Sequence, residues 1–179
     1  MSLMYTKEQE MVLFENQALQ IGMFNSNAVI SRGTRITWDP SKHTLVSAKL
    51  YCRADVSGDM NSFVVWLNNQ ETGIHFHWGM GDFSRKTAEV EISSLIQNGK
   101  NNVFDCEFRK DYGWATSTPT VWFDLVLTLT WEIVEGASPP FGDFLIPYIG
   151  LTPFELGVLT IGIGGICIGA YAYTRRKKK

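Results

Sequence analysis

Apolar and polar residues alternate with a period of two along the middle of the chain, most clearly in "TVWFDLVLTLTWEIV", residues 120–134. One set of alternate positions is entirely apolar: Val121, Phe123, Leu125, Leu127, Leu129, Trp131 and Ile133. Most of the intervening positions are polar, and Trp122 is the large exception. Successive side chains of a strand point to opposite faces, so this segment predicts a long strand with one buried face.

Shorter segments upstream repeat the alternation. In "VSAKLYCRA", residues 46–54, Lys49 and Arg53 face outward and the inward set is Val46, Ala48, Leu50, Cys52 and Ala54. The runs "FVVWL" and "IHFHW" flank the polar stretch "NNQETG", which predicts a hairpin with that stretch as its turn. In "IHFHW", "TAEVEI" and "VFDCEF" the inward positions are Ile74, Phe76, Trp78, Ala88, Val90, Ile92, Phe104, Cys106 and Phe108.

The connections between these runs contain Gly, Asn and Asp, which favour turns, and no convincing helix separates the strands. The predicted fold class is therefore mainly β, an antiparallel β-sandwich or jelly roll over residues 1–134. The first 40 residues leave two interpretations. "MVLFENQALQIGMF" fits either a first strand or a short helix, whereas "GTRITW" predicts a strand.

Two long segments, "VSAKLYCRADVSGDMNSFVVWLNNQETG" and "AEVEISSLIQNGKNNVFDCEF", followed by the closing strand, resemble the galactose-binding-like jelly roll. Many carbohydrate-binding modules and cell-surface domains share that fold. The matching framework elements are Ala48–Ala54, Leu67–Gly73 and Val90–Asn101, although "NNQE" stands where Asn-Gly is usual. The resemblance covers about residues 30–135 and implies a fold. It assigns no ligand-binding residue, because ligand contacts in that family lie on variable loops.

The pattern changes after residue 134. Residues 135–151 contain three Pro and three Gly and predict a linker at a membrane surface. Thr152, Pro153 and Glu155 form a capping box with proline at the first helical position. Residues 153–173 carry Glu155 as their only charge, and at ~1.5 Å per residue they cover about 31 Å, the thickness of a bilayer core. A single transmembrane helix is predicted over residues 152–173, with a basic tail at 174–179.

Glycines on this helix suggest a packing face. Gly162, Gly165 and Gly169 fall on one stripe, and small residues allow helices to approach closely. Self-association through this stripe is one interpretation; the general abundance of glycine in membrane helices is the other.

The basic tail predicts the orientation of the protein. It consists of Arg175, Arg176, Lys177, Lys178 and Lys179, and no Lys or Arg occurs between Lys110 and Arg175. The positive-inside rule then places the sandwich outside the cytoplasm or on the exterior of a virion. The N-terminus does not fit a signal peptide, because Lys7, Glu8 and Glu10 interrupt it. A tail-anchored protein would instead keep its domain in the cytoplasm; we favour the charge rule.

The overall charge of −2 conceals an acidic body. Without the five tail residues, 11 positive residues stand against 18 negative ones, a net charge of −7. A nucleic-acid-binding domain requires clustered cations, so only the tail is suited to nucleic acid or anionic lipid headgroups.

Three aromatic residues are candidate ligand contacts. Tyr112 and Trp114 lie in the predicted loop "RKDYGWATSTP", and Trp66 takes an outward position on its strand. A sugar ring or a partner protein stacks on such rings. The alternative for each is packing against an edge of its own domain.

Histidines and cysteines supply weaker candidates. His75 and His77 face the same side of one strand and are a weak candidate metal site, the alternative being an exposed polar strand face. Cys52 and Cys106 both face the core, where they form either a disulfide or two buried thiols.

No catalytic motif or cofactor fingerprint is present, so no cofactor is predicted. We expect a non-catalytic, membrane-anchored structural or interaction protein on a cell envelope or a membrane-containing virion. Its expected partners are the lipid bilayer and either further copies of itself or neighbouring envelope or capsid proteins. The alternative is a lectin-like module that binds a glycan.

Overall fold

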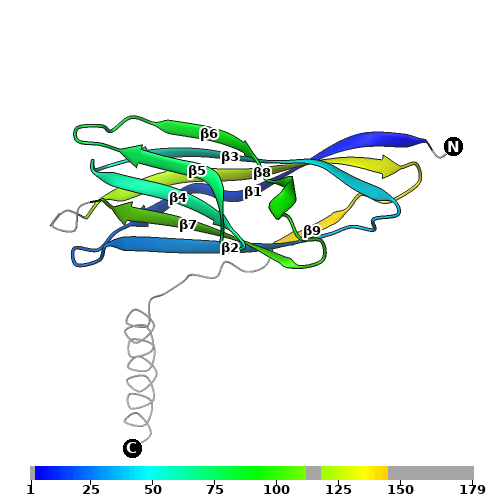
Figure 1. Cartoon of the computed structure of the whole chain (residues 1–179), viewed down its shortest axis with the longest axis horizontal. Coiled ribbons are helices and arrows are strands. Elements are labelled where there is room, and N and C mark those ends of the chain that lie inside the picture. The colour runs from blue at the N-terminus through cyan, green and yellow to red at the C-terminus, as the bar shows by residue number, and fades with distance from the viewer. Residues whose placement is uncertain (1–2, 112–117, 145–179) are drawn as a thin grey trace, which may run out of the picture. The chain divides into compact units, whose positions relative to one another are not determined.

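The computed structural model describes residues 3–111 and 118–144, and these residues form nine strands and one short 3₁₀ helix (Figure 1). The elements are β1 Met4–Gln20, β2 Asn27–Thr37, β3 His43–Val56, β4 Asn61–Leu67, β5 Gln70–Trp78, β6 Lys86–Glu91, η1 Ser93–Leu95, β7 Asn101–Lys110, β8 Thr120–Val134 and β9 Phe141–Phe144.

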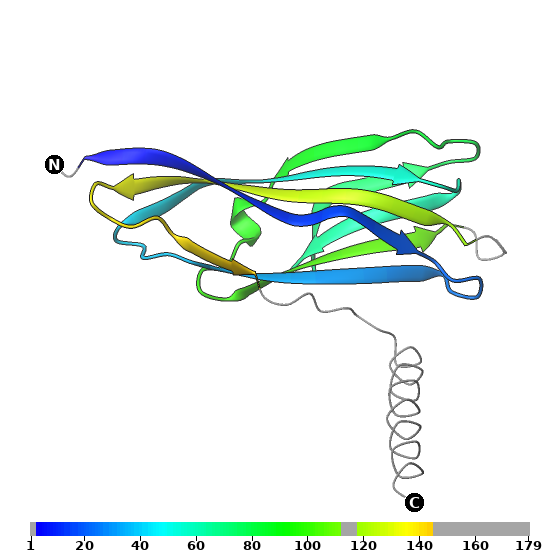
Figure 2. The ribbon, with the colours of Figure 1, turned by 180° about the vertical axis from the view of Figure 1, so that it is seen from behind.

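The strands form two packed antiparallel sheets (Figures 1 and 2). One sheet has the order β1-β8-β3-β6 and the other β5-β4-β7-β2-β9. Four of the antiparallel pairs are β1 with β8, β2 with β7, β3 with β6 and β4 with β5. This is the pairing of a long hairpin wound into two layers, so the sandwich is consistent with a jelly-roll-like fold. The prediction of a mainly β, antiparallel sandwich is confirmed.

The core lies between the sheets and is built around aromatic rings. Phe123 of β8 has its ring centroid 5.3 Å from that of Phe14 on β1 and 4.8 Å from that of Phe63 on β4. Phe123 therefore connects neighbouring strands of its own sheet with the opposite sheet. Burial of this kind is the main source of stability in such a sandwich.

The alternation of β8 is confirmed in full, because all seven of its predicted inward side chains are buried. The inward set of β3 is confirmed except for Val46, which is 52% exposed. The cause is a break in the β3–β8 register between Leu45 and Ser47. One extra residue there turns Val46 away from the core.

The β4–β5 hairpin forms, but its turn is shorter than "NNQETG". Only Asn68 and Asn69 connect the strands, with φ of 52° and 64°, and β5 begins at Gln70. Positive φ at both central residues matches the twist of a two-residue hairpin, and Asn tolerates it. The helical interpretation of the N-terminal region is wrong, since β1 runs through "MVLFENQALQ".

The chain divides into two units, residues 1–148 and 149–179. The first contains the sandwich, and the structure adds β9 within the residues predicted as a linker. No helix within residues 3–111 and 118–144 is long and apolar enough to cross a bilayer. The predicted transmembrane helix, its Gly162, Gly165 and Gly169, and the basic tail lie outside the described residues.

Candidate ligand-binding site

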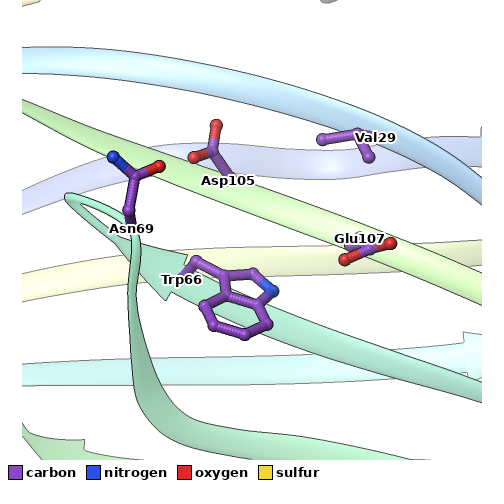
Figure 3. Close-up of a pocket in the computed structure, with 5 residues that line it drawn as sticks. All are labelled: Val29, Trp66, Asn69, Asp105 and Glu107. Carbon is purple, nitrogen blue, oxygen red and sulfur yellow. The ribbon is translucent and has the colours of Figure 1, made fainter.

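A hollow of about 300 Å³ lies on the outer face of the five-stranded sheet (Figure 3). It is lined by Val29, Trp66, Asn69, Asp105 and Glu107. These residues come from β2, β4, the β4–β5 turn and β7. The hollow therefore brings together positions from separate parts of the chain.

Strand register explains why these side chains meet. Trp66 of β4 pairs with Asp105 of β7, and Val29 of β2 pairs with Glu107. Directly opposed residues of antiparallel strands point to the same face. Asn69 borders the hollow because the two-residue turn holds it beside the end of β4 (Figure 3).

Neighbouring polar groups hold both carboxylates. Ser31 donates its hydroxyl hydrogen to Asp105, and Asn27 Nδ2 donates to Glu107 Oε1 at 2.8 Å. Arg109 donates to Glu107, and this hydrogen bond lowers the pKa of Glu107 against the opposing effect of partial burial. Glu107 is therefore a carboxylate at neutral pH and accepts hydrogen bonds.

The indole of Trp66 adds an apolar surface to these acceptors. The guanidinium carbon of Arg109 lies 6.0 Å from the centroid of the Trp66 ring, so the arginine also contributes a cation–π contact. An aromatic face beside carboxylate and amide groups suits a ligand with both C–H faces and hydroxyl donors. A saccharide has this combination.

Of the aromatic candidates, the structure places Trp66 in the hollow. Tyr112 and Trp114 lie outside the described residues, so their role stays a prediction. The lining residues Asn69, Asp105 and Glu107 were not identified from the sequence. The outward alternation of "VFDCEF" marks Asp105 and Glu107 as surface residues, but their neighbours depend on which strands pair.

His75 and His77 lie on the exposed face of β5 and each approaches a carboxylate. His75 Nδ1 is 3.6 Å from Glu71 Oε1, and His77 Nδ1 is 3.0 Å from Asp111 Oδ2. Among the residues that the structure describes, no three His, Cys, Asp or Glu side chains gather to hold a metal ion. The arrangement is that of histidine–carboxylate contacts on a polar strand face.

Cys52 and Cys106 are buried free thiols contributed by opposite sheets. Burial raises the pKa of Cys52 to about 12, and the charge of Asp124 adds to the effect. Burial also raises the pKa of Cys106. Both behave as small apolar side chains in the structure, and their pairing under oxidising conditions stays a prediction.

No protein-family model matches the chain, and no curated protein sequence does. The two-sheet fold is thus established by the strand pairing alone.

Proposed function

We propose that this chain is a non-catalytic, membrane-anchored protein that displays its β-sandwich on a cell envelope or a membrane-containing virion. The observation that carries the proposal is the division of the chain. The described residues, 3–111 and 118–144, form the two-sheet sandwich, whereas the C-terminal sequence that follows has the length, cap and basic flank of a membrane helix. Jelly-roll-like sandwiches serve in capsids and lectins, which agrees with a display role by analogy of fold.

Flotation after alkaline extraction tests the anchor. The full chain reconstituted with lipid is expected to float with the vesicles, because a spanning helix resists removal by alkali. Replacing Ile163 and Ile166 by Lys places two charges near the middle of the predicted helix and is expected to release the chain, since each costs roughly 2.5–3.5 kcal/mol there. Replacing Lys177 and Lys178 by Gln is the matched control and leaves flotation intact. Release of the unaltered chain by alkali would refute the anchor.

We further propose saccharide recognition as a second function, in agreement with the resemblance to galactose-binding-like domains. The Trp66 hollow supports it, because one indole lies among Asn69, Asp105 and Glu107 (Figure 3). The two carboxylates are held in place by Ser31, Asn27 and Arg109. Such preorganised acceptors lower the cost of ordering groups on binding.

A glycan array probed with the full chain in detergent tests this second function. Trp66→Ala is expected to abolish binding to whichever glycans the unaltered chain retains, and Asp105→Asn to weaken it. Trp122→Ala is the matched control, because Trp122 is an exposed tryptophan on the outer face of the other sheet. Equal loss of binding in the Trp66 and Trp122 variants, or no binding by the unaltered chain, would reject the hollow as a saccharide site.

A further inference from the structure

Three connections gather at one end of the sandwich: residues 21–26, 57–60 and 79–85 (Figures 1 and 2). Asp111, which follows β7, lies at the same end and donates a backbone hydrogen bond to Met60. Strand pairing fixes this arrangement. Asn61 at the start of β4 pairs with Trp78 at the end of β5 and with Lys110 at the end of β7. In the other sheet, Thr120 at the start of β8 pairs with Gln20 at the end of β1. We call this end, in its described residues, the loop end.

The loop end exposes large apolar side chains. Phe24 is 96% exposed, Met80 86%, Phe83 57% and Met23 53%. They come from two loops, 21–26 and 79–85, and none of them is buried in the core. Single exposed apolar residues are ordinary on protein surfaces, but several at one end mark an interaction surface.

Hydrogen bonds connect the loops that carry these side chains. Asp59 Oδ2 accepts a hydrogen bond of 2.8 Å from Gly81 N, which links loops 57–60 and 79–85. Asp111 N donates to Met60 O at 3.0 Å, and Lys110 N donates to Ser26 O at 2.8 Å. The loops are thus tied to one another and to β7, so the exposed side chains require little further ordering on binding.

The charges of the loop end are already partnered. The charged residues that the structure describes in these loops and directly after β7 are Asp59, Asp82, Arg85 and Asp111. Asp59 binds Gly81 N, Lys86 Nζ lies 2.8 Å from Asp82, Arg85 Nε lies 2.9 Å from Asp55, and Asp111 contacts Ser62 and His77. Each of these four charged side chains thus has a hydrogen-bond or ion-pair partner within the described residues.

We infer that the loop end docks on the surface of the same bilayer that holds the C-terminal helix, with Phe24, Met80 and Phe83 entering the interfacial region. The inference rests on the proposed membrane anchor. Tethering favours this occupant, because a surface to which the chain is itself anchored is met at high effective concentration. A few apolar side chains then suffice for contact, whereas a free partner protein requires a larger surface.

The length of the chain allows this contact. β9 runs antiparallel to β2, and its last residue, Phe144, pairs with Thr34. Asn27, where β2 leaves the loop end, lies seven residues before Thr34, about 23 Å at ~3.3 Å per residue. β9 thus directs the chain towards the loop end. The eight residues 145–152 can span at most about 26–29 Å. This reach covers the distance from Thr34 to the loop end, as the inference requires.

Depth-dependent fluorescence quenching of the full chain in phosphatidylcholine vesicles tests the inference. In a Cys167→Ser background, an environment-sensitive fluorophore is attached to Phe24→Cys or Phe83→Cys. Val46→Cys is the control, since Val46 is also exposed but lies near the start of β3, away from the loop end. We expect lipids with a nitroxide on the acyl chain to quench the two loop labels several-fold more than the Val46 label.

Two results would overturn the inference while the anchor stands. In the first, the loop labels of alkali-resistant, floating protein are quenched no more than the Val46 label. In the second, they are shielded from aqueous iodide without being quenched by the nitroxide lipid, which would place a protein surface over the loops. Release of the unaltered chain by alkali is a separate result: it refutes the anchor, and the docking inference falls with it.

Discussion

Cys52 of β3 and Cys106 of β7 contribute buried thiols to the core from opposite sheets. Burial is the main cause that raises the pKa of Cys106, and the charge of an ionised Cys52 raises it further. Because each thiol is buried in the core from a different sheet, the two report on whether the core stays closed to solvent.

Thiol reactivity is predicted to follow this burial. At pH 8 the folded chain should leave the peptides that contain Cys52 and Cys106 unmodified by iodoacetamide, because the thiolate is the reactive form and the pKa of Cys52 is about 12. Urea should make both reactive, and Val46→Cys gives an exposed thiol as the positive control. Mass spectrometry of the digests measures the result. Rapid modification of either native thiol would contradict the packing, whereas loss of two hydrogen atoms from the joined peptides would reveal a disulfide.

Adjacent aromatic residues of β8 should differ sharply in their effect on stability. Phe123 is buried against Phe14 and Phe63, so Phe123→Ala is expected to lower the free energy of unfolding by about 3–5 kcal/mol. Trp122 points outward and is 40% exposed, so Trp122→Ala should cost less than about 1 kcal/mol. Urea unfolding of both variants measures the difference, and equal losses would be inconsistent with the inward and outward assignment of β8.

Glu91 should make stability depend on pH in the acid range. Burial opposes its ionisation, but hydrogen bonds from Ser47, Ser93 and the Ala48 N–H outweigh burial and lower its pKa from 4.5 to about 2. A lowered pKa in the folded state adds stability above the unfolded pKa, and that stability is lost as pH falls towards 2. Glu91→Gln should therefore destabilise at pH 7, by an amount that shrinks between pH 4.5 and 2.

The control for Glu91 lies on the same strand. Glu89 contacts Lys49 at 3.2 Å through two exposed side chains, so Glu89→Gln should have little effect at either pH. Urea unfolding at pH 7 and pH 3 compares the two variants with the unaltered chain. A constant difference between Glu91→Gln and the unaltered chain at both values would disprove the role of the Glu91 carboxylate.

Variants of the two β4–β5 turn residues allow the contribution of side-chain hydrogen bonds to stability to be measured apart from that of backbone conformation. Both have positive φ, but only Asn68 reaches distant groups: it accepts a hydrogen bond from Val103 N and donates to Asn102 and to Leu95 O. Asn68→Gly should cost about 1–3 kcal/mol because a part-buried network loses its partner. Asn69→Gly should change stability by less than about 0.5 kcal/mol. Thermal unfolding measures both, and a similar loss in both would contradict the role assigned to the Asn68 hydrogen bonds, since glycine tolerates positive φ at either position.

Strands with one buried face were predicted well, because burial imposes the period of two that the sequence displays. β8 and β7 are examples: Leu125 and Phe104 are buried as their alternation predicts. The ambiguous stretch, residues 11–24, shows the opposite case. Leu13 and Phe14 are both buried although they are consecutive. The β1–β8 register is irregular between Val12 and Phe14 and between Phe14 and Gln17, so the period of two is lost there.

The remaining differences between prediction and structure arise from features that the alternation of apolar and polar residues within one strand does not reveal. Val46 is exposed because an irregularity in the register shifts one residue, and a single extra residue leaves no trace in composition. The Trp66 hollow depends on the pairing of Trp66 with Asp105 across two strands that lie far apart in the sequence. Trp66 was recognisable by type and outward position, whereas its acidic neighbours became visible only with the sheet order.

Lysine labelling across a sealed membrane tests the membrane-anchored display most directly. A membrane-impermeant amine reagent is added to sealed vesicles that contain the full chain. Mass spectrometry then compares the labelling of Lys42 and Lys49 in the sandwich with the labelling of the tail lysines, Lys177, Lys178 and Lys179. Lys42 and Lys49 are exposed on the sandwich. The account predicts that each molecule is labelled either on the sandwich or on the tail, and on both only after detergent opens the vesicles. Molecules labelled on both in intact vesicles would contradict it.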